Sequence, residues 1–236
     1  MTSSSIAAAM SGQDDDRTAI WVQIPDGYVP LPLDNIGPQM AQAQEILDEV
    51  GPEESRATVA PLVGVLTVFL HELAARNAVY CGIAHYASAI DGSKITSSLV
   101  VALQEFPEKV NPRILLKDLV LTKAAAGERG QVDMVDVLGK PTLFMERVRE
   151  LPTPTFPGQP PAPQGSATAV FQLEALVPAD DGATLVSIEL STPFVEHGPE
   201  FRGMVVEMAA SVSFTAPPPI DDESPTHKSI ADALRG

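Results

Sequence analysis

The chain has one cysteine and few aromatic residues among its 236 residues. A disulfide needs two cysteines, so Cys81 excludes an intrachain bridge, and a lone thiol in an apolar run usually packs as a small core residue. Aromatic residues make up only 5% of the sequence, whereas hydrophobic residues make up 44%. The core of the protein must therefore consist mainly of aliphatic side chains.

Positive charge is scarce, and long apolar runs are missing. Lysine and arginine number 15 against 31 acidic residues, a net charge of −16. Such a surface repels the phosphates of nucleic acids and anionic membranes, so we expect neither as a partner. The longest apolar run, residues 57–70, is shorter than the roughly 20 residues of a membrane-spanning helix. Residues 1–10 lack the basic segment of a signal peptide, which favours a soluble, cytoplasmic protein.

Motifs for catalysis and metal binding are absent or incomplete. The His-Glu dipeptide at 71–72 begins a zinc-protease motif, but Ala75 occupies the position of the second histidine. The Gly-Lys dipeptide at 139–140 resembles the end of a phosphate-binding loop, but Met134 occupies the position of the upstream glycine. No G-x-S-x-G segment is present for a nucleophilic serine. We therefore expect no metal, no cofactor and no enzymatic activity.

Other titratable residues have structural interpretations. Cys81 and His85 share one side of a predicted strand and could form a catalytic pair, but a buried core cysteine is the favoured interpretation. Asp133 and Asp136 lie on opposite sides of a strand, so they cannot act as a paired acid and base unless a bulge intervenes. His197 lies near the start of the last predicted helix, where we expect a structural role.

The first third of the chain predicts a strand followed by two helices. Residues 1–17 are small and polar, and we expect a disordered tail there. Residues 19–24 form the predicted strand, and helices are predicted at 39–50 and 54–76. The second helix carries apolar residues at steps of three and four, which indicates one broad buried stripe. The members of this stripe are Val59, Leu62, Val63, Leu66, Phe69, Leu70 and Leu73.

After residue 77 the apolar period changes to two, which is typical of strands. Three pairs of such segments flank glycine-containing turns: 78–90 with 94–106, 131–138 with 142–148, and 168–177 with 184–191. Asp-Gly between apolar runs indicates a hairpin because a type I′ turn needs positive φ angles. A helix is predicted to begin at Asn111-Pro112, and a last helix precedes a short closing strand at 212–214.

This order of elements predicts one α+β domain over residues 18–215. Its mostly antiparallel sheet of about six to seven strands would be flanked by helices, as in an α/β/α sandwich. The order, the segment Ile20-Trp-Val-Gln-Ile-Pro25 and residues 191–214 resemble the PsbP-like superfamily. That superfamily includes a photosystem II extrinsic protein, a Ran-binding import factor, DcrB-type proteins and actinobacterial proteins of unknown function. The resemblance implies protein binding without chemistry, and it transfers no functional residue.

Two segments outside the regular elements are candidate partner-binding sites. The proline-rich loop at residues 151–166 is expected to be extended, and it combines P-x-x-P spacings with Phe156. A plain spacer is the alternative. Residues 216–236 are expected to form a flexible acidic tether, on which Ile230 and Leu234 share one side of a short amphipathic helix. A frayed terminus is the alternative there.

Two functions follow from these observations. The leading hypothesis is a non-enzymatic, cytoplasmic protein-interaction module, a chaperone or adaptor that docks onto a larger assembly through its C-terminal tail. The alternative is a small-ligand-binding protein, or an unrecognised enzyme, that uses a cleft between the helices at 39–76 and the sheet. Tyr80, His85 and Tyr86 are the candidate polar contacts of that cleft. A pocket with convergent polar groups would favour the alternative.

Overall fold

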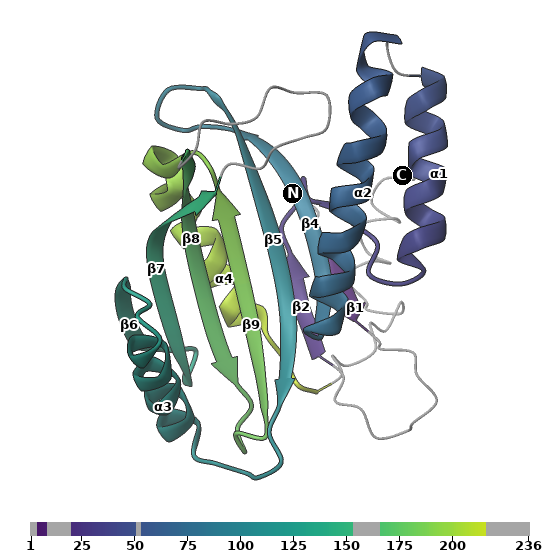
Figure 1. The fold of residues 1–236 in the computed structure, drawn as a ribbon. Helices are drawn as coiled ribbons and strands as arrows, with labels where there is room; N and C mark the ends of the chain where they lie inside the picture. Colours follow the sequence, from purple (N-terminus) through teal and green to yellow (C-terminus); the bar gives the residue numbers. More distant parts are fainter. Residues whose placement is uncertain (1–3, 9–19, 51–52, 153–165, 216–236) are drawn as a thin grey trace, which may run out of the picture.

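The computed structural model describes residues 4–8, 20–50, 53–152 and 166–215 (Figure 1). Its centre is one antiparallel sheet of seven strands in the order β3-β4-β5-β9-β8-β7-β6. These strands are β3 (Val29–Pro30), β4 (Ala78–Ala87), β5 (Lys94–Glu105), β6 (Gln131–Val137), β7 (Lys140–Pro152), β8 (Ala167–Pro178) and β9 (Thr184–Thr192). The predicted α+β class, with its mostly antiparallel sheet and flanking helices, is confirmed.

The helices are α1 (Ile36–Val50), α2 (Glu53–Ala75), α3 (Pro112–Ala125) and α4 (Arg202–Ser211), with a 3-10 helix η1 (Val195–Phe201) before α4. The predicted start of α3 is confirmed, since the Asn111 side chain accepts a hydrogen bond of 3.0 Å from the N–H of Arg113. Pro199 falls within η1, so the predicted last helix is formed in two parts. Among the described residues, no helix has the length and apolar character needed to cross a bilayer.

All three predicted hairpins are present. They are β4–β5, β6–β7 and β8–β9, and each strand pair is antiparallel. Gly92, Gly139 and Gly182 lie in the three turns with φ angles of 72°, 83° and 67°. The positive φ explains why glycine occupies these positions.

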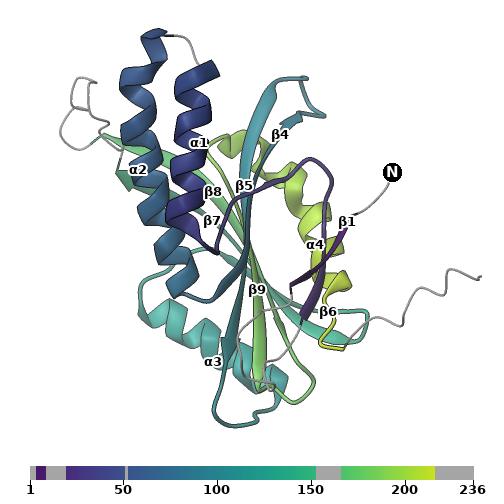
Figure 2. The same ribbon diagram turned by 90° about the vertical axis from the view of Figure 1, so that its right-hand side faces the viewer.

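One face of the sheet, here called the closed face, carries the main core of the protein. Figure 2 shows the sheet nearly edge-on, with α4 and β1 on one side and α1, α2 and α3 on the other. Apolar residues at alternate positions of β5, β8 and β9 point to the closed face and pack against α4, η1 and β2 (Ile20–Ile24). The core residues of these three strands are Ile95, Leu99, Val101, Leu103, Phe171, Leu173, Ala175, Val177, Val186, Ile188 and Leu190.

The other face, here called the open face, has helices only toward its two sides. α1 and α2 pack on the side of β4, where Leu70 and Val63 bury Cys81. α3 packs on the side of β7 and β8, through Leu115 and Leu116. A strip of middle strands around β9, between α2 and α3, has no described helix in front of it (Figure 1).

Three details correct the expectations from the sequence. Ser4–Ala8, expected in a disordered tail, form β1, which pairs with β2 in a separate two-stranded sheet. Leu151 and Pro152, expected in the proline loop, extend β7 opposite β8, where β6 no longer flanks the strand and a missing N–H is tolerated. The predicted closing strand is reduced to one bridge, in which Ser213 and Trp21 of β2 exchange two hydrogen bonds of 2.9 Å.

The β8–β9 turn gives a direct test of this packing. A Cβ atom at Gly182 would lie 1.8 Å from the carbonyl oxygen of Val110, whereas nothing lies within 4 Å of one at Gly92. Both glycines have positive φ, so Gly92→Ala should cost only the backbone strain, about 1–2 kcal/mol. We expect Gly182→Ala to cost at least about 3 kcal/mol, because the backbone at Val110, just before α3, must shift as well. Urea denaturation of both variants measures the difference, and equal losses would contradict the close approach.

Candidate functional site

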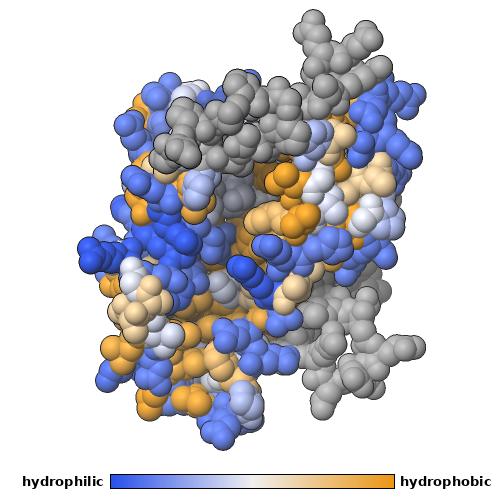
Figure 3. Space-filling view, viewed as in Figure 1, coloured by the Kyte–Doolittle hydropathy of each residue, from blue (hydrophilic) through white to orange (hydrophobic). Residues whose placement is uncertain are grey.

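A groove of about 440 Å³ lies on the open face between α2 and the middle strands. Phe69 and Leu73 of α2, with Arg76 just after the helix, form one side of this sheet groove. β4, β5, β9, β8, the end of β7 and Pro193 supply the rest of its described lining. Figure 3 shows the hollow near the middle of this face, with apolar side chains on its right, toward α2, and polar side chains on its left.

Beside the groove, α2 carries a second apolar stripe, of which Phe69 lines the groove. Leu62, Val65 and Phe69 recur at helical spacing but are 50%, 51% and 45% exposed. Val63 and Leu70 lie on another side of the helix and are buried. The single buried stripe predicted from the sequence is therefore two stripes, one in the core and one beside the groove.

The floor of the groove combines polar side chains with the apolar Ile83, Val100 and Val170. Thr96 and Ser98 of β5, Glu189 and Ser191 of β9, and Gln172 of β8 line it. Register places Ser98 opposite Ser191, and Ser191 opposite Gln172, across neighbouring strands. The sequence carries a signal for these residues, since they alternate with the core residues of the same strands. Alternation alone suggests a solvent-facing side and does not identify a groove.

Two cations beside the floor are engaged by other carboxylates. Lys123 of α3 donates a hydrogen bond of 2.9 Å to Glu174 Oε2. Arg147 of β7 pairs with Glu128 and donates to Gln172 Oε1 at 3.0 Å. Both positive charges are therefore held on the β7–β8 side of the strip.

Among the described residues, the hydrogen-bond donors to Glu189 are neutral. Its Oε1 accepts from Gln172 Nε2 at 3.1 Å and from Ser191 Oγ at 3.3 Å. Burial raises the pKa of the Glu189 carboxyl above its ordinary value, and the Glu174 carboxylate directly across the strand pair raises it further. The charge of Arg147 opposes this rise in part. Glu189 is thus a carboxyl whose negative charge is poorly compensated.

The residues predicted for the cleft are divided between the two faces. Tyr80 and Tyr86 point into the core of the closed face, and burial raises the pKa of Tyr80 to about 12. His85 lies on the open face, where it is exposed and its Nδ1 is 2.9 Å from Thr96 Oγ1. Strand parity already separates position 85 from positions 80 and 86. Of the three, only His85 adjoins the groove, through Thr96.

The other predicted residues are easily placed. Phe156, Ile230 and Leu234 lie outside the described residues. Cys81 is buried beneath α2, which raises the pKa of its thiol to about 11. Asp136 pairs with Arg113 of α3 on the open face, and Asp133 lines a cavity on the closed face. No group of three metal-binding side chains occurs in the described part of the chain.

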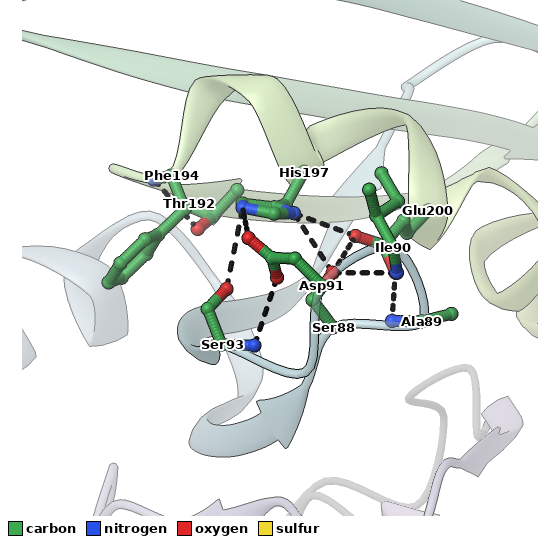
Figure 4. A network of polar contacts seen from close by, with 9 residues as sticks. All are labelled: Ser88, Ala89, Ile90, Asp91, Ser93, Thr192, Phe194, His197 and Glu200. Atoms are coloured by element: carbon green, nitrogen blue, oxygen red, sulfur yellow. Dashed lines mark hydrogen bonds and ion pairs between the residues drawn. The ribbon is translucent and has the colours of Figure 1, made fainter.

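A second polar cluster ties η1 to the β4–β5 turn (Figure 4). It consists of Ser88, Asp91, Ser93, His197 and Glu200 and is here called the His197 cluster. The Nδ1 atom of His197 lies 2.9 Å from Glu200 Oε1 and 3.0 Å from Ser88 Oγ. Its Nε2 atom lies 3.5 Å from Ser93 Oγ and 3.9 Å from Asp91 Oδ2. The contacts thus run from the Ser93 hydroxyl to the His197 ring and on to the Glu200 carboxylate, as in a hydrolytic triad.

The backbone of the turn makes the His197 cluster unsuited to acyl transfer. Its N–H groups are occupied: Ala89 donates to Glu200, Ile90 to the Ser88 hydroxyl, and Ser93 to Asp91. The described turn therefore offers no pair of donors for an oxyanion. Although burial favours the neutral acid, the donors from Ala89 and Ser88 lower the pKa of Glu200, as expected for a carboxylate that holds a loop in place.

A smaller cavity of about 290 Å³ lies on the closed face between β6 and α4. Arg202 and Glu146 line it and form a bidentate ion pair with distances of 2.6 and 2.7 Å. The charges of this cavity are thus largely satisfied within the protein. The sheet groove is larger and contains the poorly compensated carboxyl, which makes it the stronger candidate site.

Neither a scan against family models nor a search of curated proteins gives a match to this chain. The resemblance to the PsbP-like superfamily stays a prediction. Function must therefore be argued from the geometry of the groove.

Glu189 gives a prediction about stability and pH. Because its pKa is raised in the folded state, the folded protein gains stability when Glu189 is protonated, and that gain is lost as the pH rises through the raised pKa. Glu189→Gln removes the charge and keeps the size of the side chain. We expect it to raise the free energy of unfolding at pH 7 by about 1 kcal/mol, or the melting temperature by about 2–4 °C.

The advantage of Glu189→Gln should shrink as the pH falls through the raised pKa of Glu189 and should be largely gone below 4.5, the ordinary value for glutamate. Thermal unfolding at pH 7 and pH 4 measures it. Glu105→Gln, at an exposed position near the far end of β5, is the matched control and should change little. A lower melting temperature of Glu189→Gln at pH 7 would contradict this account of the carboxyl.

Proposed function

We propose that this chain is a non-enzymatic binding protein that holds a small, mainly apolar ligand in the sheet groove. The observation that carries the proposal is the groove itself, whose volume of about 440 Å³ falls within the range of small-molecule sites. One apolar wall on α2 faces a floor with several hydrogen-bonding groups. Such a lining combines burial of apolar surface with a few contacts that orient the ligand.

The polar groups favour binding over catalysis. Thr96 and His85 are the only hydroxyl–imidazole pair at the groove, and no described side chain orients His85 from its other nitrogen. A base without such a partner is a poor candidate for activating a hydroxyl. The cytoplasm remains the proposed compartment, supported by a single, buried Cys81.

Two neighbouring positions of α2 test the groove. Phe69 lines it, whereas Val68 is 61% exposed and does not. We expect the uncharged fluorescent probe N-phenyl-1-naphthylamine to bind the full chain, and Phe69→Ser to weaken binding about tenfold because much of the apolar wall is lost. Val68→Ser is the matched control and should bind the probe as the unchanged protein does. Fluorescence titration measures this, and equal affinity of all three proteins would refute the site.

A protein-interaction module, the leading hypothesis from the sequence, is the second candidate function. The supporting observation is that Leu62, Val65 and Val68 expose apolar side chains on α2 beyond the lining of the groove. Exposed apolar surface of this kind is common where a partner protein docks. The same surface would be available whether or not the groove is filled.

The second candidate makes a different prediction for α2. We expect the tagged protein to recover a stable partner from its native host, and the double variant Val65→Ser/Val68→Ser to lose it, because both changes remove apolar contact area. Affinity purification followed by mass spectrometry compares the two. A variant lacking residues 216–236 tests the predicted tail in parallel. If neither change reduces the recovery of any protein, this candidate fails, whatever the probe titration shows.

A further inference from the structure

Among the described residues that line the sheet groove, Glu189 is the only acidic one and Arg76 the only basic one. No ion pair joins Glu189 to a cation within the described ranges of the chain. The carboxyl sits on β9, in the middle of the sheet, and its donors in the described part of the chain are Gln172 and Ser191. A partly buried carboxylate with neutral donors alone is stabilised when a cation comes into contact with it.

The cations nearest to Glu189 are directed elsewhere. Lys123 donates to Glu174 at 2.9 Å and lies 3.6 Å from Glu128, while Arg147 pairs with Glu128. Glu174 occupies the position opposite Glu189 on β8, so the network satisfies one of two facing carboxylates and leaves the other. Of the two facing carboxylates, Glu189 lines the groove and has no ion-pair partner among the described residues.

We propose that the sheet groove binds a small amphiphile with a single positive charge, an ammonium group on an apolar body. The ammonium would contact the Glu189 carboxylate, and the apolar body would lie against Phe69 and Leu73. This inference depends on the proposed function, since it names the class of ligand for the same groove. An ammonium has three N–H donors, and the hydroxyl oxygens of Ser98 and Ser191 are further acceptors on the groove floor.

The electrostatics of the whole chain favour a cation over an anion. The net charge of −16 attracts positively charged ligands and repels anionic ones. An anionic amphiphile would have to use Arg76, which is exposed at the end of α2, where solvent screens the attraction. It would also bring a second negative charge close to Glu189.

Three ligands with the same eight-carbon body test the charge. We expect isothermal titration calorimetry of the full chain at pH 7 to give octylammonium an affinity about tenfold higher than that of 1-octanol, with octanoate weakest. Glu189→Gln should reduce the affinity for octylammonium to that of 1-octanol, so that the preference for the charged ligand disappears. Glu105→Gln is the matched control and should leave all three affinities unchanged.

The outcomes separate this inference from the proposed function. Equal affinities of octylammonium and 1-octanol for the unchanged protein would overturn the charge preference while the groove remains a ligand site. Tightest binding of octanoate would overturn it in favour of Arg76. If none of the three ligands binds although the naphthylamine probe does, the inference fails alone. If the probe fails as well, the proposed function fails with it. The comparison of ligands in the unchanged protein does not depend on how the variant folds.

Discussion

The structure depends on a mismatch between the width of the sheet and the reach of the helices that cover it. Seven strands are wider than the two helical layers packed on the open face, whereas α4, η1 and β2 close the other face. A central strip of strands therefore carries a core on one side and a groove on the other. The same strands fix both, because their alternate residues point to opposite faces.

The charges of the strip follow from the register of the strands. Pairing of β8 with β9 places Glu174 directly opposite Glu189, and α3 approaches from the side of Glu174. Lys123 can therefore neutralise Glu174, while burial and the facing Glu174 carboxylate raise the pKa of Glu189. Because Lys123 pairs with Glu174 and Arg147 pairs with Glu128, Glu189 is left available to a cationic ligand.

The turns around the strip are held rigidly, which suits a preformed binding site. The His197 cluster fixes the β4–β5 turn to η1, and Gly182 allows the β8–β9 turn to approach Val110 closely. The closed core beneath includes Tyr28, whose hydroxyl is 2.9 Å from Ser97 Oγ. Floor residues on β5 and β9 therefore rest on a packed layer, and a ligand would not need to order them.

The sequence by itself determined the elements and their pairing into hairpins. Period-two segments around Asp91-Gly92 and around Gly182 specify local turns, and Asn111-Pro112 specifies the start of α3, because turns and caps depend on neighbouring residues. The alternation of side chains along a strand also separates His85 from Tyr80 and Tyr86. The same alternation predicts that Asp133 and Asp136 lie on opposite sides of the sheet.

Only the tertiary structure decided what lies above each face. Ser98, Gln172 and Glu189 alternate with core residues and look like the solvent side of a strand, and Phe69 looks like part of a buried stripe. They meet at one groove because α2 and α3, far apart in sequence, stop short of each other across the sheet. The distance between two packed helices is set by the whole core, so no local pattern of residues encodes it.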